Sequence, residues 1–170
     1  MLLEPNLYLN SVKDITVDIL RENKIKGLIL DVDNTLIDFN ENILEGVKDW
    51  IVEMKKQNMK LCIVSNSNKV EKIQMVADTL QIEDYFYFAK KPLKCGFKKA
   101  KKRMNLKESN IAVVGDQLFT DVLGANHAKM FSILVKPLNE KDIWITRLKR
   151  PIEQFFIKRY EKKRGTKDVF

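Results

Sequence analysis

The sequence lacks the features that mark membrane-spanning and secreted proteins. Its 170 residues include two cysteines and no apolar run near the roughly 18 residues that cross a bilayer. The first residues also lack the basic start and long apolar centre of a signal peptide. Low-complexity segments, internal repeats and linkers are missing as well. We therefore expect one cytoplasmic domain in which Cys62 and Cys95 are reduced thiols.

Positive charge is in excess and is unevenly placed. The net charge is +8, and residues 136–170 hold eleven Lys or Arg against five Asp or Glu. Such a segment suggests an anionic partner, which could be nucleic acid, phospholipid head groups or a phosphorylated substrate. A solvated helical surface would explain it equally well.

Apolar, β-rich runs alternate with stretches of helical periodicity, which predicts an α/β fold with crossover helices and a mostly parallel sheet. The predicted strands are 27–30, 61–64, 85–88, 111–114 and 131–135. Two predicted helices present the apolar faces Ile43, Val47, Trp50, Ile51, Met54 and Val70, Ile73, Val76, Ala77, Leu80. A short amphipathic helix is predicted ahead of the first strand from Val12, Ile15, Ile19 and Leu20. We expect a single domain over 1–170, with a core of about 10–138 and a basic helical extension over about 139–165.

Two carboxylates follow the first predicted strand. Asp31 and Asp33 lie in the run Asp-Val-Asp-Asn-Thr, which ends at Thr35. Two carboxylates this close repel each other unless a cation neutralises them, and Mg²⁺ favours oxygen ligands that include one or two carboxylates. Parallel strands deliver their carboxyl ends to one edge of the sheet, where α/β proteins bind ligands.

Two further segments follow the second and third strands. Ser65 and Asn66 come after 61–64, where small polar side chains can cap a helix whose N–H groups favour an anion. A plain N-cap is the alternative. Lys90 and Lys91 come after 85–88, and a lysine there would supply a compact positive charge for a phosphate or carboxylate.

A second acidic segment follows the fourth strand. Gly115 permits a tight exit, Asp116 would face the same edge as Asp31, and Asp121 begins or enters the next helix. The alternative role of Asp121 is favourable charge at a helix start.

In this order the four segments resemble the motifs of the haloacid dehalogenase (HAD) superfamily of phosphatases, which are DxDxT, a small hydroxyl residue, a Lys, and GDxxxTD. The resemblance runs from about residue 26 to 135. It implies a Rossmann-like fold with helices on both faces of the central sheet, and Mg²⁺ as the cofactor.

The resemblance also implies roles for the first two segments. Asp31 would be the nucleophile that becomes an aspartyl phosphate. Asp33 would act as general acid and then base, and its main-chain carbonyl would bind Mg²⁺. Thr35, Ser65 and Asn66 would bind the phosphoryl oxygens or shape their loop.

For the other two segments, the implied roles concern charge. Lys91 would offset the negative charge of nucleophile and phosphate, and it is preferred to Lys90 because the family lysine commonly precedes a Pro. Asp116 would be the second carboxylate on Mg²⁺. Asp121 would bind the metal through water or support its ligands.

Two positions depart from the pattern of the family. Asn34 stands where many relatives have Gly, and Asn tolerates the left-handed conformation that such a turn needs. Lys129 stands where the helix after GDxxxTD often ends in Gly, at a cost of about 1 kcal/mol.

The spacing leaves no room for a large cap domain, because seven residues separate Thr35 from Ile43. An open site would admit large or surface-bound phosphoesters, and a second subunit could also serve as a lid, so a homo-oligomer stays open. A narrower resemblance, to bacterial YqeG-type proteins of HAD subfamily IIIA, rests on the run from Leu28 to Leu36 and on Lys-Pro-Leu-Lys-Cys-Gly-Phe. YqeG-type proteins are similar to mitochondrial phosphatidylglycerophosphate phosphatases, which implies a lipid phosphomonoester at the inner face of the membrane.

The basic C-terminal region could form a helix that lies on anionic lipid. Its apolar face would comprise Ile152, Phe155, Phe156 and Tyr160. These side chains could instead pack on the domain or on a second copy. Two other functions stay open, a phosphatase of soluble sugar or nucleotide phosphates and a non-catalytic module that binds nucleic acid or protein. We expect no nucleic-acid partner, because no RNA-recognition pattern with stacking aromatics is present.

Overall fold

One parallel sheet organises the chain. The computed structural model describes residues 2–138, 154–155, 157–159 and 161–162. Within them, six strands form a sheet in the order β1-β6-β5-β2-β3-β4, and every neighbouring pair is parallel. The strands are β1 (Leu7–Leu9), β2 (Gly27–Leu30), β3 (Lys60–Val64), β4 (Asp84–Phe86), β5 (Ile111–Gly115) and β6 (Phe131–Val135). The predicted α/β class is confirmed, and the sheet is wholly parallel within these residues.

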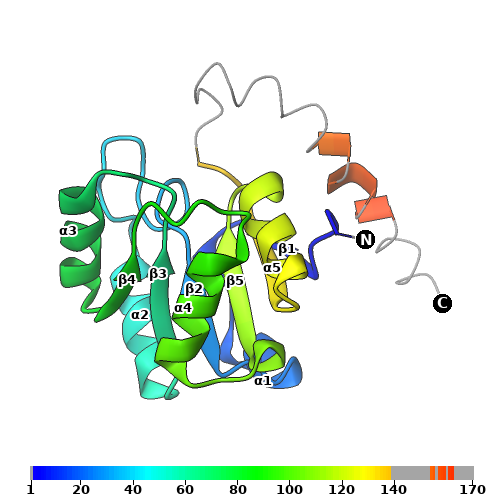
Figure 1. The fold of residues 1–170 in the computed structure, drawn as a ribbon, viewed down its shortest axis with the longest axis horizontal. Helices are drawn as coiled ribbons and strands as arrows, with labels where there is room; N and C mark the ends of the chain where they lie inside the picture. The colour runs from blue at the N-terminus through cyan, green and yellow to red at the C-terminus, as the bar shows by residue number, and fades with distance from the viewer. Residues whose placement is uncertain (1, 139–153, 156, 160, 163–170) are drawn as a thin grey trace.

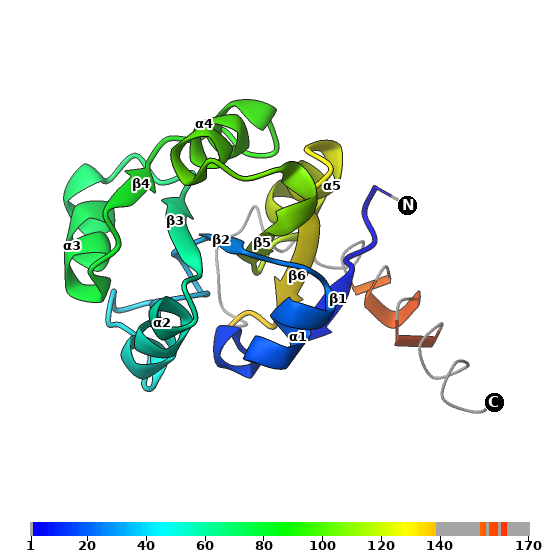
Figure 2. The same ribbon diagram turned by 90° about the horizontal axis from the view of Figure 1, so that it is seen from below.

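Helices cover both faces of the sheet (Figures 1 and 2). They are α1 (Val17–Glu22), α2 (Val47–Lys56), α3 (Val70–Leu80), α4 (Lys94–Met104) and α5 (Leu123–His127). Successive side chains of a strand point to opposite faces. Leu28 and Leu30 therefore pack with α1, α2 and α3, whereas Ile29 packs with α4 and α5. Strands β2 and β5 are buried along their whole length, as expected for strands covered on both sides.

The N-terminal segment differs from the prediction. The sequence analysis missed β1, which pairs with β6 at the edge of the sheet. Side chains reinforce this pairing, because the main-chain N–H of Ser132 donates to Asn6 Oδ1 at 2.8 Å and that of Asn6 donates to Ser132 Oγ at 3.1 Å. The single predicted helix is divided into a 3₁₀ turn, η1 (Val12–Asp14), and α1. Ser11 caps η1 in a capping box.

Two predicted element boundaries are also wrong. Ile43 lies outside α2, because Gly46 precedes that helix with φ of 79° and Ile43 instead forms a bridge with Ile37. Strand β4 ends at Phe86, and the exposed residues Tyr87 and Phe88 belong to the turn that follows. That turn leads into the lysine segment, so its shape matters for the site.

No cap domain interrupts the fold within residues 2–138. The loop between β2 and α2 carries two isolated bridges, and α3 and β4 fill the stretch between β3 and the lysine segment. Cys62 is buried and Cys95 is exposed, and both are free. No helix in the described part of the chain is long and apolar enough to cross a membrane.

The predicted basic extension lies mostly outside the described residues, as do Ile152, Phe156 and Tyr160 of its proposed apolar face. The described residues between 154 and 162 are helical. Ile157 packs against the small cluster of Leu118, Val122 and Leu134, while Phe155 is exposed. Ile157, which was not among the residues of that predicted face, is thus the described residue of this region that packs on the domain.

Candidate active site

The polar segments converge at the edge where β2, β3 and β5 end. Leu30 of β2 is in register with Ile63 of β3 and Val114 of β5. Asp31 thus leaves its strand beside the ends of both neighbours, and its main-chain N–H donates to the carbonyl of Val114 at 2.9 Å. Asp116 directly follows β5. The convergence follows from parallel pairing, because all carboxyl ends share one edge.

A buried lysine joins two of the carboxylates. Lys91 Nζ donates to Asp31 Oδ1 at 2.7 Å and to Asp121 Oδ1 at 2.6 Å. The three side chains are at most 10% exposed. Lys90 is exposed instead, with its Nζ 5.1 Å from the centre of the Phe88 ring. Of the two lysines in the predicted segment, Lys91 is therefore the one that reaches the carboxylates.

Asn66 fixes the main chain of Lys91. The Lys91 N–H donates to Asn66 Oδ1 at 2.6 Å, and Asn66 Nδ2 donates to the Lys91 carbonyl at 3.1 Å. The neighbouring Ser65 is buried, and its Oγ accepts from the N–H of Ser67 at 3.1 Å. Helix α3 begins only at Val70, so Ser65 does not cap it and the α3 N–H groups do not adjoin Ser65. The N-cap interpretation is therefore wrong, and the side chain of Asn66 orders the lysine turn.

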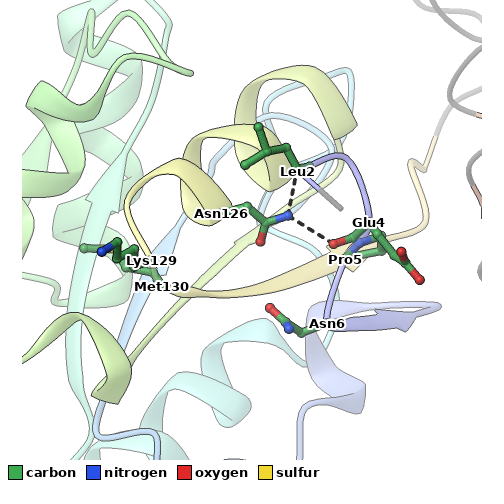
Figure 3. A pocket seen from close by; sticks show the side chains of 7 residues that line it. All are labelled: Leu2, Glu4, Pro5, Asn6, Asn126, Lys129 and Met130. Carbon is green, nitrogen blue, oxygen red and sulfur yellow. Dashed lines mark hydrogen bonds between the residues drawn. The ribbon is translucent and has the colours of Figure 1, made fainter.

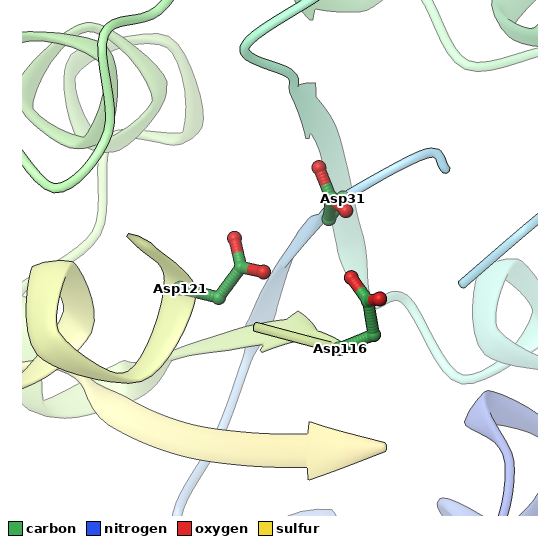
Figure 4. A group of neighbouring side chains, drawn as sticks. All are labelled: Asp31, Asp116 and Asp121. Atoms are coloured by element: carbon green, nitrogen blue, oxygen red, sulfur yellow. The ribbon is translucent and has the colours of Figure 1, made fainter. Parts of the chain in front are cut away.

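Three carboxylates form a cluster that could hold a metal ion (Figure 4). Ligand oxygens of Asp31, Asp116 and Asp121 lie within 4.8 Å of one another. Among the described residues, Asp116 Oδ1 and Thr35 Oγ1 are buried without a hydrogen-bond partner, which costs about 1–3 kcal/mol for each group. Both oxygens of Asp121 accept hydrogen bonds, Oδ1 from Lys91 and Oδ2 from the Gln117 N–H at 3.2 Å. The donor set fits Mg²⁺, with Asp116 offering the unpaired oxygen.

The charges of the cluster do not balance. Burial raises the pKa of Asp31 to about 7, against the opposing effect of Lys91. Burial and then the charges of Asp31 and Asp121 raise the pKa of Asp116 well above its ordinary value. Burial opposes the charge of Lys91, but Asp121 and Asp31 outweigh it and raise its pKa. One ammonium faces three carboxylates, so a divalent cation would complete the charge balance.

Asp33 is not one of the three clustered carboxylates, and it pairs with a lysine of its own. Lys72 Nζ lies 2.7 Å from Asp33 Oδ1, and the Lys72 side chain is 9% exposed although it belongs to the first turn of α3. The sequence analysis missed Lys72, since a lysine beside an apolar helix face normally lies in solvent. Asp33 itself is half-exposed at the open edge.

Local backbone geometry permits the close approach of these groups. A Cβ on Gly115 would lie 2.2 Å from the carboxyl carbon of Asp121, so only glycine leaves room for that side chain. Asp121 itself belongs to a π-helical turn, η3 (Leu118–Val122), a local geometry that often marks functional sites. Asn34 and Lys129 both adopt φ of 59°, the left-handed conformation predicted for them.

A surface hollow of about 800 Å³ lies elsewhere (Figure 3). Its walls come from the segment ahead of β1, from Asn126 of α5, and from Lys129 and Met130. Asn126 Nδ2 spans it, donating to the carbonyls of Leu2 at 2.8 Å and Glu4 at 3.0 Å. No residue of the carboxylate cluster lines this hollow.

Known phosphatases are similar to this chain in sequence. The protein named Probable phosphatase YqeG of Bacillus subtilis is 36% identical over 160 residues, which cover 94% of this chain and 92% of that protein. Glyceraldehyde 3-phosphate phosphatase of Pyrococcus furiosus is 27% identical over 99 residues, 54% of this chain and 41% of the relative.

Solved structures agree on the fold. An uncharacterized protein from Listeria monocytogenes superposes with a TM-score of 0.57 at 18% identity, over 70% of this chain and 85% of the other. The structure of 3-deoxy-D-manno-octulosonate 8-phosphate phosphatase from Yersinia pestis superposes with a TM-score of 0.50 at 15% identity, over 72% of this chain and 79% of the other.

The parallel sheet and the motifs at its edge, together with these relatives, define an HAD-type phosphatase. Membership of a phosphatase family argues against the alternative of a non-catalytic binding module. Residues 1–138 match the family described as Mitochondrial PGP phosphatase, and the chain belongs to that family.

Proposed function

We propose that the chain is a Mg²⁺-dependent phosphomonoester hydrolase that works through an aspartyl phosphate and acts on phosphatidylglycerophosphate. One observation carries the chemistry. Lys91 bridges Asp31 and Asp121 in a buried cluster, beside an oxygen of Asp116 that has no partner among the described residues. A nucleophile, a fixed positive charge and a free ligand atom are what transfer of a phosphoryl group requires.

The reaction would proceed in two displacements. A carboxylate oxygen of Asp31 attacks phosphorus in line, so the bond to the ester oxygen breaks and an acyl phosphate forms. Asp33 donates its proton to the departing oxygen, which leaves as an alcohol. Asp33 then takes a proton from water as the water oxygen attacks phosphorus, which releases inorganic phosphate and restores Asp31. Lys91 offsets the charge of Asp31 and the phosphoryl group throughout.

Asp31 and Asp116 would hold the metal ion, with the main-chain carbonyl of Asp33 as a further ligand and Asp121 in support. When bound, Mg²⁺ supplies positive charge that stabilises the phosphoryl oxygens as charge shifts during transfer. We propose that the hydroxyls of Thr35 and Ser65 bind those oxygens, and the unpartnered, buried Oγ1 of Thr35 supports the assignment of Thr35.

Two observations support a lipid substrate. The family is described as PGP phosphatase, and the site has no cap domain over it within residues 2–138, which suits a substrate held at a surface. We accordingly expect a cytoplasmic protein that works at the inner face of the membrane. A second candidate is a soluble phosphometabolite, because one relative is a glyceraldehyde 3-phosphate phosphatase.

A phosphate-release screen tests the proposal. The purified chain would be given phosphatidylglycerophosphate in mixed micelles, glyceraldehyde 3-phosphate, a sugar phosphate, a nucleotide and p-nitrophenyl phosphate, each with Mg²⁺ or EDTA. We expect the lipid to be turned over best, EDTA to abolish turnover, and Asp31→Asn to abolish it as well. Asp18→Asn serves as the matched control, since this side chain is 81% exposed on α1.

The results separate chemistry from substrate. Turnover that survives EDTA or Asp31→Asn would refute the mechanism. Faster hydrolysis of a soluble phosphate than of the lipid would leave the mechanism standing and would favour the second candidate.

A further inference from the structure

Helix α4 is strongly basic. Six of its eleven residues are Lys or Arg and none is acidic. Its apolar side packs on the sheet through Phe97, Ala100 and Met104, so the basic side chains face outward. The basic residues are Lys94, Lys98, Lys99, Lys101, Lys102 and Arg103.

Only part of this charge is compensated within the protein. Lys101 pairs with Glu108, and Arg103 Nε lies 2.6 Å from Asp84 Oδ1. In the part of the chain that the structure describes, no carboxylate forms an ion pair with the exposed Lys94, Lys98, Lys99 or Lys102. Two of these, Lys94 and Lys98, lie on the N-terminal half of α4, whose beginning adjoins the active site.

The turn leading into α4 exposes apolar side chains beside these lysines. Phe88 is 55% exposed and Leu93 60% exposed. Phe88 also has φ of 49°, a strained conformation for an aromatic residue, and it is held there by a hydrogen bond from its N–H to the Ser67 carbonyl at 2.8 Å. A strained backbone that exposes an aromatic ring to water does not stabilise the fold. Backbone strain of this kind clusters at functional sites. Lys90, with φ of 56°, places its ammonium over this ring.

These residues adjoin the active site. Lys91, whose ammonium lies between the carboxylates, comes from the same turn, and α4 starts at Lys94. In Figure 1 the turn runs across the end of the sheet to which the strands point, and α4 descends from it along one face. Phe88, Lys90, Leu93, Lys94 and Lys98 thus form a corner between the catalytic edge and α4, here called the basic-apolar corner.

We propose that the basic-apolar corner docks on an anionic phospholipid bilayer. Its lysines match a negatively charged surface, and Phe88 and Leu93 can enter the headgroup region, a combination typical of interfacial binding. Docked in this way, the corner brings Lys91 and the carboxylates next to lipid head groups. The inference rests on the proposed function in so far as the substrate is one of those head groups.

The test is flotation of the full chain with vesicles of phosphatidylcholine alone or with 30 mol% phosphatidylglycerol. Two variants carry matched changes on opposite faces of the sheet, each with two Lys→Gln substitutions and one exposed aliphatic residue replaced by Asn. The corner variant is Leu93→Asn, Lys94→Gln, Lys98→Gln, and the control is Lys48→Gln, Val52→Asn, Lys56→Gln on the exposed side of α2. Both lose the same charge, and both keep the basic C-terminal region.

We expect the wild type to bind the anionic vesicles, and less so as salt rises. Each lysine near such a surface strengthens the binding constant for the membrane roughly fivefold. The corner variant, which loses two lysines, should therefore bind the anionic vesicles at least roughly 25-fold more weakly than the wild type. The binding constant of the control variant should stay within about twofold of the wild-type value. Equal losses in the two variants, or no loss in the corner variant, would overturn the proposal. So would single-stranded RNA that binds the corner more tightly than the vesicles do.

Hydrolysis of p-nitrophenyl phosphate keeps this outcome separate from the proposed function. The corner variant should retain wild-type turnover of this soluble substrate, because none of its altered residues touches the carboxylates. Corner-dependent vesicle binding by a chain that releases no phosphate would support docking and refute the proposed function. Phosphate release by a chain whose vesicle binding does not depend on the corner would support the proposed function and refute docking through the corner.

Discussion

Lys91→Met would test the balance of charge in the active site. The substitution keeps the volume of the side chain but removes the ammonium that lies 2.7 Å from Asp31 and 2.6 Å from Asp121. Both carboxylates would remain buried without their cation. Removing one partner of a buried ion pair costs about 3–5 kcal/mol, mostly because the charge left behind is poorly solvated. For a chain of this size that corresponds to a melting temperature lower by about 6–20 °C.

The measurement is urea unfolding followed by circular dichroism at pH 7.5 in EDTA. Lys101→Met is the matched control, because the pair of Lys101 with Glu108 is more than a third exposed on both sides and solvent screens it. Adding Asp121→Asn to Lys91→Met should recover part of the lost stability, since it removes one of the stranded charges.

Two results would refute this reasoning. If Lys91→Met were no more destabilising than Lys101→Met, Lys91 would not be holding ionised carboxylates together. If Asp121→Asn worsened rather than relieved the double variant, the cost would come from lost packing instead of unpaired charge.

Three more predictions concern the same site. In EDTA, Asp31 of the native protein should keep its proton up to about pH 7, whereas the unfolded chain loses that proton near pH 4. The free energy of unfolding should therefore fall as the pH rises from about 4 to 7, and Asp31 should contribute up to about 1.4 kcal/mol per pH unit to this fall, as measured by urea titrations. Lys72→Met should lower kcat for p-nitrophenyl phosphate roughly 10- to 100-fold with little change in KM, because Lys72 fixes the carboxylate of Asp33, and Lys72→Arg should restore part of it. Gly115→Ala should displace Asp121 and lower stability by about 1–3 kcal/mol, together with phosphatase activity, in thermal melts and phosphate-release assays.

Each of these three predictions can be contradicted by a specific result. The pH slope should be smaller in Asp31→Asn, where the raised pKa of Asp116 still contributes, and weaker with excess Mg²⁺, which binds the ionised form. A slope that is unchanged in Asp31→Asn would assign it to another group. A rise in KM alone in Lys72→Met would indicate that Lys72 binds substrate instead of positioning Asp33. An unchanged melting temperature for Gly115→Ala would mean that Asp121 can move without loss of stability.

The convergence of the site could be predicted because it depends only on strand order. Each segment follows an apolar run, and parallel pairing brings all the strand ends to one edge. Strand order alone does not tell which of Lys90 and Lys91 reaches the carboxylates, because it does not fix the direction of either side chain. That choice depends on the left-handed backbone at Phe88 and Lys90 and on the two hydrogen bonds between the Asn66 side chain and the main chain of Lys91, which no pattern of residue types reveals.

What the sequence analysis missed was set by contacts between distant segments. Lys72 looks like a solvent-facing helix residue until α3 is placed beside the loop after β2. The three residues of β1 are too few for a periodicity, and they become a strand only by pairing with β6. Ile43 matched the apolar period of α2, but the left-handed Gly46 separates it from the helix.

The pairing of β1 with β6 has a consequence for how the chain is made. Leu7 is opposite Ile133, and Asn6 bonds to Ser132 across 126 positions of sequence. A growing chain therefore cannot complete its sheet until nearly the whole domain has left the ribosome, and until then the open edge of β6 and the apolar side of β1 have no partner. Late closure of this kind slows folding and exposes strand edges to other chains. For this protein, the residues of β1 would be synthesised before the rest of the sheet and would be among the last of its strands to reach their place.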